Sequence, residues 1–129
     1  MNESRNYFKR LNGKESNMAK LVEVNLERGF PTVDVAMSRL KNEVTTAKMS
    51  GCKAMIIIHG FGSSGEGGKI KSASKIQLKK PMFKGIIKDM VGGEDWLTKK
   101  KEFLNHCPQL KNSERHISGN QGITVLLLR

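Results

Sequence analysis

The sequence has little of three things: cysteine, long apolar runs and aromatic side chains. Its two cysteines, Cys52 and Cys107, are too few for a disulfide framework, and neither has the spacing to a second ligand that metal sites need. The longest apolar run, "ITVLLL", is too short to cross a bilayer, and the N-terminal stretch lacks the apolar segment of a secretory signal. These absences predict a cytoplasmic protein without membrane contact.

Aromatic residues make up 5% of the chain, and only Trp96 and Tyr7 carry large amphipathic rings. A stacking platform for single-stranded nucleic acid is therefore disfavoured. Acidic residues are also scarce, with 12 Asp and Glu against 23 Lys and Arg, so that the net charge is +11. Such an excess attracts polyanions and releases counterions from phosphates. The charge indicates DNA or RNA as the partner, and no small-molecule cofactor is expected.

A chain of 129 residues is long enough for one domain. Residues 1–18 are polar and without period, which predicts a disordered N-terminal tail, and the folded domain is expected over residues 19–129. At its start, "LVEVNLERG" alternates apolar and polar residues in the manner of a half-buried strand. Glu23, Asn25 and Glu27 share the polar face of that strand.

The next segments predict a helix and a second strand. "PTVDVAMSRLKNEVTTAKMSG" has helical periodicity, with Thr32 as the N-cap and Gly51 ending the helix. "AMIII", residues 54–58, is typical of a central strand because it is short and continuously apolar. The links are short, so the two strands should lie parallel, joined by a right-handed crossover.

The remaining elements complete the fold. "KIKSASKIQLKK" predicts a helix that ends before Pro81, "GIIKDMV" a third strand, "EDWLTKKKEFLNHC" another helix and "GITVLLL" a deeply buried last strand. The predicted fold class is α/β, a two-layer βαβαβ(α)β sandwich with helices packed on a four-stranded, mostly parallel mixed sheet.

The glycine-rich stretch "IIIHGFGSSGEGGKIK", residues 56–71, carries the chemistry. An esterase oxyanion turn is excluded because no serine lies in a G-x-S-x-G elbow. A P-loop is excluded because Ser63 and Ile70 stand where glycine and a hydroxyl are required. What remains is a turn whose backbone N–H groups can converge on an anion, followed by seven lysines and no acid between residues 69 and 88. Because Glu66 would repel a phosphate, the alternative remains that this stretch is a surface loop without a binding role, beside lysines that face solvent.

In its place after a strand–helix–strand unit, this loop resembles that of the Smr (small MutS-related) domain family. The shared features are the H-G-x-G motif at His59, Gly60 and Gly62, the "GGKI" that follows, and the closing turn "SGNQGITVLLL". The resemblance covers about residues 20–129, with 92–118 similar to an insertion before the last strand. It implies an α/β domain of proteins that handle nucleic acids, some of which nick DNA or cleave RNA.

Family nucleases carry an L-D-x-H-G motif at the end of the first strand, and the corresponding segment here is "VNLERG". Asn25 stands in place of the aspartate and Glu27 in place of the histidine. Asparagine cannot act as a general base, whereas Glu27 brings one carboxylate to the same side. The resemblance therefore implies that nuclease chemistry is lost or altered and that nucleic-acid binding is kept.

The candidate catalytic residues are His59, at a strand end where α/β sheets gather ligands, Glu27 and Asn25; a lone histidine there is equally often structural. The candidate nucleic-acid contacts come from the loop, the lysine-rich helix and the end of the first strand: Gly60, Gly62, Ser63, Ser64, Gly67, Gly68, Lys69, Lys71, Lys75, Lys79 and Arg28. No metal ligand is assigned, although the nuclease alternative implies a divalent cation. Three functions stay open: a nucleic-acid-binding domain, an endonuclease using His59 and Glu27, and a basic protein-interaction module.

Overall fold

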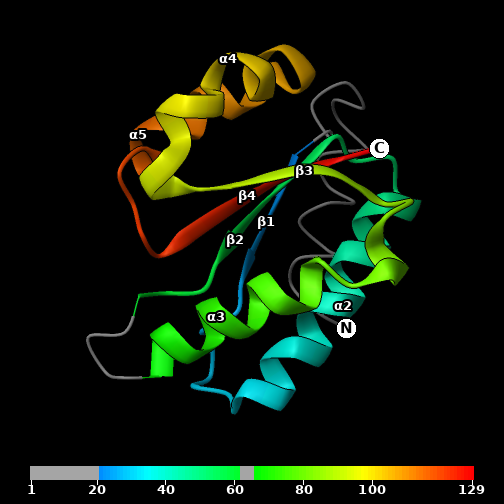
Figure 1. Ribbon diagram of the computed structural model, residues 1–129, viewed down its shortest axis with the longest axis vertical. Coiled ribbons are helices and arrows are strands. Elements are labelled where there is room, and N and C mark those ends of the chain that lie inside the picture. Colours follow the sequence, from blue (N-terminus) through cyan, green and yellow to red (C-terminus); the bar gives the residue numbers. More distant parts are fainter. Residues whose placement is uncertain (1–20, 62–65) are drawn as a thin grey trace.

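A computed structural model of the protein describes residues 21–61 and 66–129 (Figure 1), so the predicted tail, residues 1–18, lies outside the described residues. The elements in chain order are β1 (Leu21–Asn25), α2 (Val33–Met49), β2 (Ala54–Ile58), α3 (Glu66–Leu78), the 3-10 helix η2 (Pro81–Phe83), β3 (Ile87–Gly92), η3 (Gly93–Asp95), α4 (Trp96–His106), η4 (Pro108–Ser113), α5 (Glu114–Ile117) and β4 (Ile123–Leu128). The predicted strands and longer helices are confirmed, with α3 beginning three residues earlier than predicted.

The first strand–helix–strand unit forms for the reasons that its sequence indicates. The side chain of Thr32 accepts a hydrogen bond from the backbone N–H of Val35 at 3.2 Å and caps α2. Gly51 ends that helix with a φ of 81°, a left-handed conformation that favours glycine. β1 and β2 pair in parallel, as predicted, from Leu21 opposite Ala54 onwards.

The order of the strands in the described sheet is β1-β2-β4-β3. β4 lies between β2 and β3 and is antiparallel to both, so one of the three strand pairs in the described residues is parallel. The prediction of a mixed four-stranded sheet is confirmed, but the prediction that it is mostly parallel is wrong. The reason is that β1, β2 and β3 run in one direction, whereas β4, buried along its whole length, takes the central place between β2 and β3 and runs opposite to both.

Helices cover both faces of the sheet, which corrects the predicted two layers to three (Figure 1). α2 and α3 pack on one face, where Leu126 and Leu128 of β4 point. α4 and α5 pack on the other, against Val125 and Leu127. The predicted insertion, residues 92–118, contributes this second helical layer.

No helix within residues 21–61 and 66–129 combines the length and the apolar character that crossing a membrane requires.

Candidate functional site

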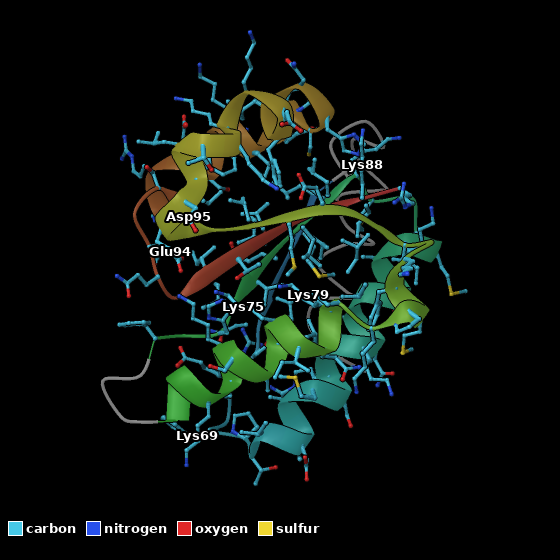
Figure 2. All side chains as sticks on the ribbon, in the orientation of Figure 1. Lys69, Lys75, Lys79, Lys88, Glu94 and Asp95 are labelled. Carbon is cyan, nitrogen blue, oxygen red and sulfur yellow. The ribbon has the colours of Figure 1, made fainter. Side chains whose placement is uncertain are left out.

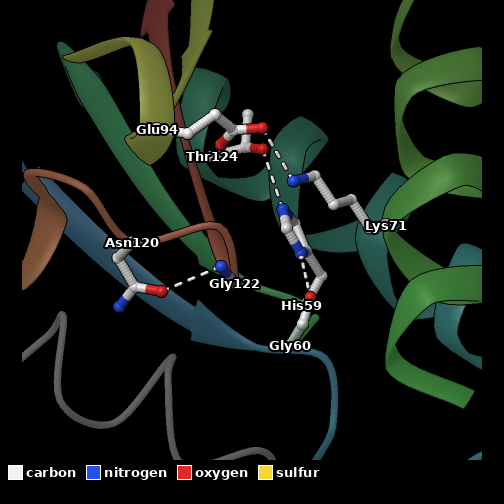
Figure 3. Close-up of polar contacts among 7 residues, drawn as sticks. All are labelled: His59, Gly60, Lys71, Glu94, Asn120, Gly122 and Thr124. Carbon is white, nitrogen blue, oxygen red and sulfur yellow. Dashed lines mark hydrogen bonds and ion pairs between the residues drawn. The ribbon is translucent and has the colours of Figure 1, made fainter. Parts of the chain in front are cut away.

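His59 follows β2 directly and its side chain is completely buried. Its Nδ1–H donates to the carbonyl oxygen of Gly60 at 2.8 Å, and its Nε2 accepts from the hydroxyl of Thr124 at 2.8 Å (Figure 3). Because a carbonyl oxygen can only accept, the first contact places the proton of the neutral ring on Nδ1. His59 thus ties the end of β2 to β4, with no exposed surface for a substrate.

Burial lowers the pKa of His59 below its ordinary value of 6.5; the hydrogen bond to Gly60 opposes this shift, and the positive charge of Lys71 adds to it. Below pH 6.5 the unfolded chain therefore takes up a proton that the folded chain does not, so the free energy of unfolding should fall as the pH drops below 6.5. Urea denaturation at about pH 7.5 and about pH 5.5 measures this loss. His59→Gln should reduce it, whereas His116→Gln, at an exposed position, should not. A wild type that becomes more stable on acidification contradicts the prediction.

Lys71 does not belong to an exposed lysine stripe. Its Nζ donates to Glu94 Oε2 at 2.8 Å, its side chain is 11% exposed, and its Nζ lies 5.0 Å from the centroid of the Phe61 ring. Burial acts to raise the pKa of Glu94, but the hydrogen bond from Lys71 and its charge outweigh burial and lower that pKa. The three lysines of this helix that were predicted to contact nucleic acid are therefore divided: the charge of Lys71 is compensated, and Lys75 and Lys79 are exposed.

Five exposed lysines follow along α3, η2 and β3, and we call them the lysine ridge: Lys75, Lys79, Lys80, Lys84 and Lys88. Figure 2 shows Lys75 and Lys79 on the side of α3 toward β3, and Lys69 on the other side of that helix. No member of the ridge forms an ion pair with another residue in the described ranges. Part of the ridge lines a groove of about 350 Å³ beside β3, with Arg129 on its border and the apolar Phe83 inside.

On the face of the sheet that carries α5, an open cleft of about 1070 Å³ runs between the ends of β1 and β2 and the turn from α5 to β4. We call it the α5 cleft. Its lining includes Glu23 and Glu27, Phe61 in the loop after β2, and Arg115 and His116 of α5. Within the described residues, none of these four ionisable side chains forms an ion pair or a side-chain hydrogen bond.

Glu27 is brought to the glycine loop by a turn after β1. Its backbone N–H donates to Asn25 Oδ1 at 2.9 Å, and its carboxylate lies against Gly60. A Cβ atom at position 60 would come within 1.9 Å of Glu27 Oε2 and displace that carboxylate, and the φ of 75° at Gly60 favours glycine. Glu27 and the loop thus meet as predicted. Asn25 is exposed, its side chain accepts the hydrogen bond from the backbone of Glu27, and it does not line the α5 cleft.

Some backbone N–H groups of the glycine loop already donate hydrogen bonds to other parts of the protein. The N–H groups of His59 and Gly60 both donate to the carbonyl oxygen of Gly122, at 2.9 and 3.1 Å, so the predicted unshielded N–H at Gly60 already has an acceptor. Among the other predicted contacts, Gly67 and Gly68 lie in the first turn of α3.

The remaining predicted contacts are placed as follows. Lys69 is exposed in the first turns of α3, and Arg28 is exposed after β1. Gly62, Ser63 and Ser64 lie outside the described residues.

The sequence-based set lacked most of the α5 cleft, including Glu23, Phe61, Arg115 and His116. The alternation in "LVEVNLERG" already placed Glu23 beside Glu27, so that residue had a signal. Phe61 sits inside the H-G-x-G motif but was treated as its variable position. Arg115 and His116 had no signal, because α5 reaches the end of β2 only through the tertiary fold.

Within residues 21–61 and 66–129, no three His, Cys, Asp or Glu side chains gather closely enough to hold a metal ion. Trp96, one of the two rings considered for base stacking, is fully buried, and Tyr7 lies outside the described residues.

A family model described as the Smr domain matches residues 28–129. Among solved structures, the Smr domain of MutS2 from Thermus thermophilus is similar, with a TM-score of 0.50 and 20% identity over 85% of this chain and 98% of that chain. No curated protein matches the chain. The matched region begins after Asn25 and Glu27, so the departure from L-D-x-H-G stays a prediction.

Proposed function

Since the chain belongs to the Smr domain family, we propose that it binds DNA or RNA by contacting the phosphate backbone with the lysine ridge. The family is associated with nucleic-acid binding and nicking. The observation that carries the proposal is the contrast between Lys71, whose charge is compensated by an ion pair with Glu94, and the five ridge lysines, none of which forms an ion pair in the described residues.

Uncompensated lysines favour phosphate binding for a physical reason. Each lysine that neutralises a phosphate releases condensed counterions, and this entropy gain supplies most non-specific affinity for nucleic acid. The net charge of +11 adds long-range attraction. The ridge extends from α3 to β3, so its lysines can follow successive phosphates rather than one ion.

The start of α3 adds a second kind of phosphate contact to the proposal. Backbone N–H groups in the first turn of a helix have no partner within the helix and carry a partial positive charge. Gly67 and Gly68 in that turn present no side chain to obstruct a phosphate, and Lys69 and Arg28 contribute positive charge at exposed positions. Gly62, which the resemblance matches, and Ser63 and Ser64 of the same loop stay part of this proposed contact, and all three lie outside the described residues.

Binding is favoured over cleavage because His59, the first candidate for acid–base chemistry, is buried and held by two hydrogen bonds. The endonuclease alternative keeps one supporting observation, the carboxylate of Glu27 in an open cleft beside Gly60. A nicking assay on supercoiled DNA and structured RNA, with and without a divalent cation, separates the two. Cutting that Glu27→Gln abolishes would make cleavage the function.

Salt dependence tests the proposal. For duplex DNA, log affinity should fall with log salt by about 0.9 per neutralised phosphate. Changing Lys79, Lys80 and Lys84 to Gln should make this slope shallower by about 2 to 3 units. The matched control changes Lys41, Lys53 and Lys101 to Gln, which removes the same charge from exposed positions outside the ridge.

Two outcomes would count against the ridge. Equal changes of slope in the two triple variants would show that net charge alone matters. A wild-type slope near zero, or no binding at low salt, would leave the protein-interaction module as the function.

A further inference from the structure

The α5 cleft has a composition that differs from the lysine ridge. It combines one exposed aromatic ring, two carboxylates and two basic side chains, all facing the same open space: Phe61, Glu23, Glu27, Arg115 and His116. A site for phosphate alone would exclude the carboxylates, because they repel it. A site with both a ring and acceptors suits a planar ligand that carries N–H donors.

Phe61 presents a flat apolar surface in a fixed place. Its side chain is 59% exposed, so a ligand in the cleft can reach it. The Nζ of Lys71 lies over the ring at 5.0 Å, and the ion pair with Glu94 holds that lysine in place. The cation lies over the ring, and the exposed part of the side chain is available to a stacking partner.

Glu27 supplies acceptors next to that ring. Its carboxylate lies against Gly60, the residue immediately before Phe61, so the acceptor oxygens and the aromatic surface are neighbours. Its side chain has no ion-pair partner among the described residues. A carboxylate without an ion-pair partner can accept hydrogen bonds from two adjacent N–H groups of a ligand, such as the N1–H and the amino group of guanine.

The α5 residues in the lining of the cleft provide the positive charge that a nucleotide also needs. Arg115 and His116 belong to α5, and neither side chain has a polar partner in the described part of the chain. Arginine binds phosphate through its planar fork, which suits the backbone on either side of a base. The cleft therefore offers separate positions for a base and for its phosphate.

We infer that the α5 cleft binds one unpaired nucleobase, with its ring stacked on Phe61, its N–H donors on Glu27 and its phosphate beside Arg115. This inference rests on the proposed function and names the class of nucleic acid. A base in a continuous duplex cannot expose its face and its pairing edge together, so the ligand is a loop, a bulge or a single strand. Guanine fits best, because it alone presents an imino and an amino donor side by side.

Three DNA hairpins test the inference: one with an all-thymidine loop, one with a single loop guanosine and one with inosine in its place. The guanosine hairpin should bind tighter than the thymidine hairpin by about 5- to 150-fold, with inosine between them because it lacks the amino group. Phe61→Ala should weaken binding of the guanosine hairpin by about 5- to 150-fold.

Further variants separate stacking from other effects. Phe61→Leu keeps an apolar side chain without a π face and should bind as weakly as Phe61→Ala, whereas Phe61→Trp should retain affinity. Glu27→Gln should remove the preference for guanosine over thymidine. The matched control is Met49→Ala, an apolar side chain that is 83% exposed at the end of α2.

The two proposals fail in different ways. If Phe61→Ala binds each of the three hairpins with the same affinity as Met49→Ala, the base site is refuted. Salt-dependent binding of the duplex stem would in that case still support the ridge. If no hairpin is preferred by the wild type, the base site is likewise refuted. If the protein binds no nucleic acid at low salt, both proposals are wrong. Circular dichroism shows that each variant is folded.

Discussion

The Gly93→Ala variant is expected to lose about 3 kcal/mol or more of unfolding free energy. A Cβ atom at position 93 would lie 2.2 Å from the carbonyl oxygen of Asn120 and 2.5 Å from that of Ile117. Both obstacles are backbone atoms, so no side-chain rotation relieves the clash. The turn from α5 to β4 would have to move away, and the hydrogen bond from Gly119 N–H to the Gly93 carbonyl, 2.9 Å long, would break with it.

Urea denaturation followed by the fluorescence of the single tryptophan measures this loss. Gly85→Ala is the matched control, since a Cβ atom at position 85 meets no described atom within 4 Å and Gly85 has no positive φ. The control should change stability by no more than about 0.5 kcal/mol. Equal stability of the two variants would contradict the packing described for Gly93.

Trp96→Ala is expected to cost about 3 to 5 kcal/mol. The side chain of Trp96 is fully buried and meets the ring of Phe103 edge-on, with centroids 5.9 Å apart and planes at 79°. Its Nε1–H donates to Glu114 Oε2 at 2.9 Å, which links α4 to α5. Removal of the ring would leave a cavity in the apolar core between the sheet and the helices α4 and α5, and it would break that link.

Thermal unfolding followed by circular dichroism measures the effect, because the variant lacks its tryptophan. Leu97→Ala, the next residue along α4, is the matched control: its side chain is 73% exposed, and the change should cost no more than about 0.5 kcal/mol. Trp96→Phe should fall between the two, since it keeps a ring but loses the hydrogen bond to Glu114. A Trp96→Ala variant as stable as Leu97→Ala would contradict the packing of α4 against this face of the sheet.

The strand–helix–strand unit from β1 to β2 was predictable because each of its signals is local. Alternation in "LVEVNLERG" follows from the two-residue period of a strand, and the cap at Thr32 needs only the N–H of Val35. Gly51 ends α2 through its own backbone freedom. The meeting of Glu27 with the glycine loop was also predictable, since parallel neighbouring strands end at the same edge of a sheet.

The ion pair of Lys71 could not be predicted from the residues near it in the sequence. On a helix Lys71 shares a stripe with Lys75 and Lys79, and nothing near it in the sequence distinguishes the three. The difference comes from Glu94, 23 residues further along the chain, which η3 brings within 2.8 Å of one lysine. Which lysines stay available to phosphate is therefore decided by a contact that no helical period encodes.

The amino-acid sequence determines the elements of this protein, its excess of positive charge and the glycine loop that marks its family, because periodicity, capping and composition act over a few residues. The tertiary structure alone decides that β4 lies between β2 and β3, that α4 and α5 cover the second face, and that Arg115 and Glu27 line the same cleft. Those arrangements depend on how the whole chain buries its apolar surface at once, and the segments involved are far apart in sequence.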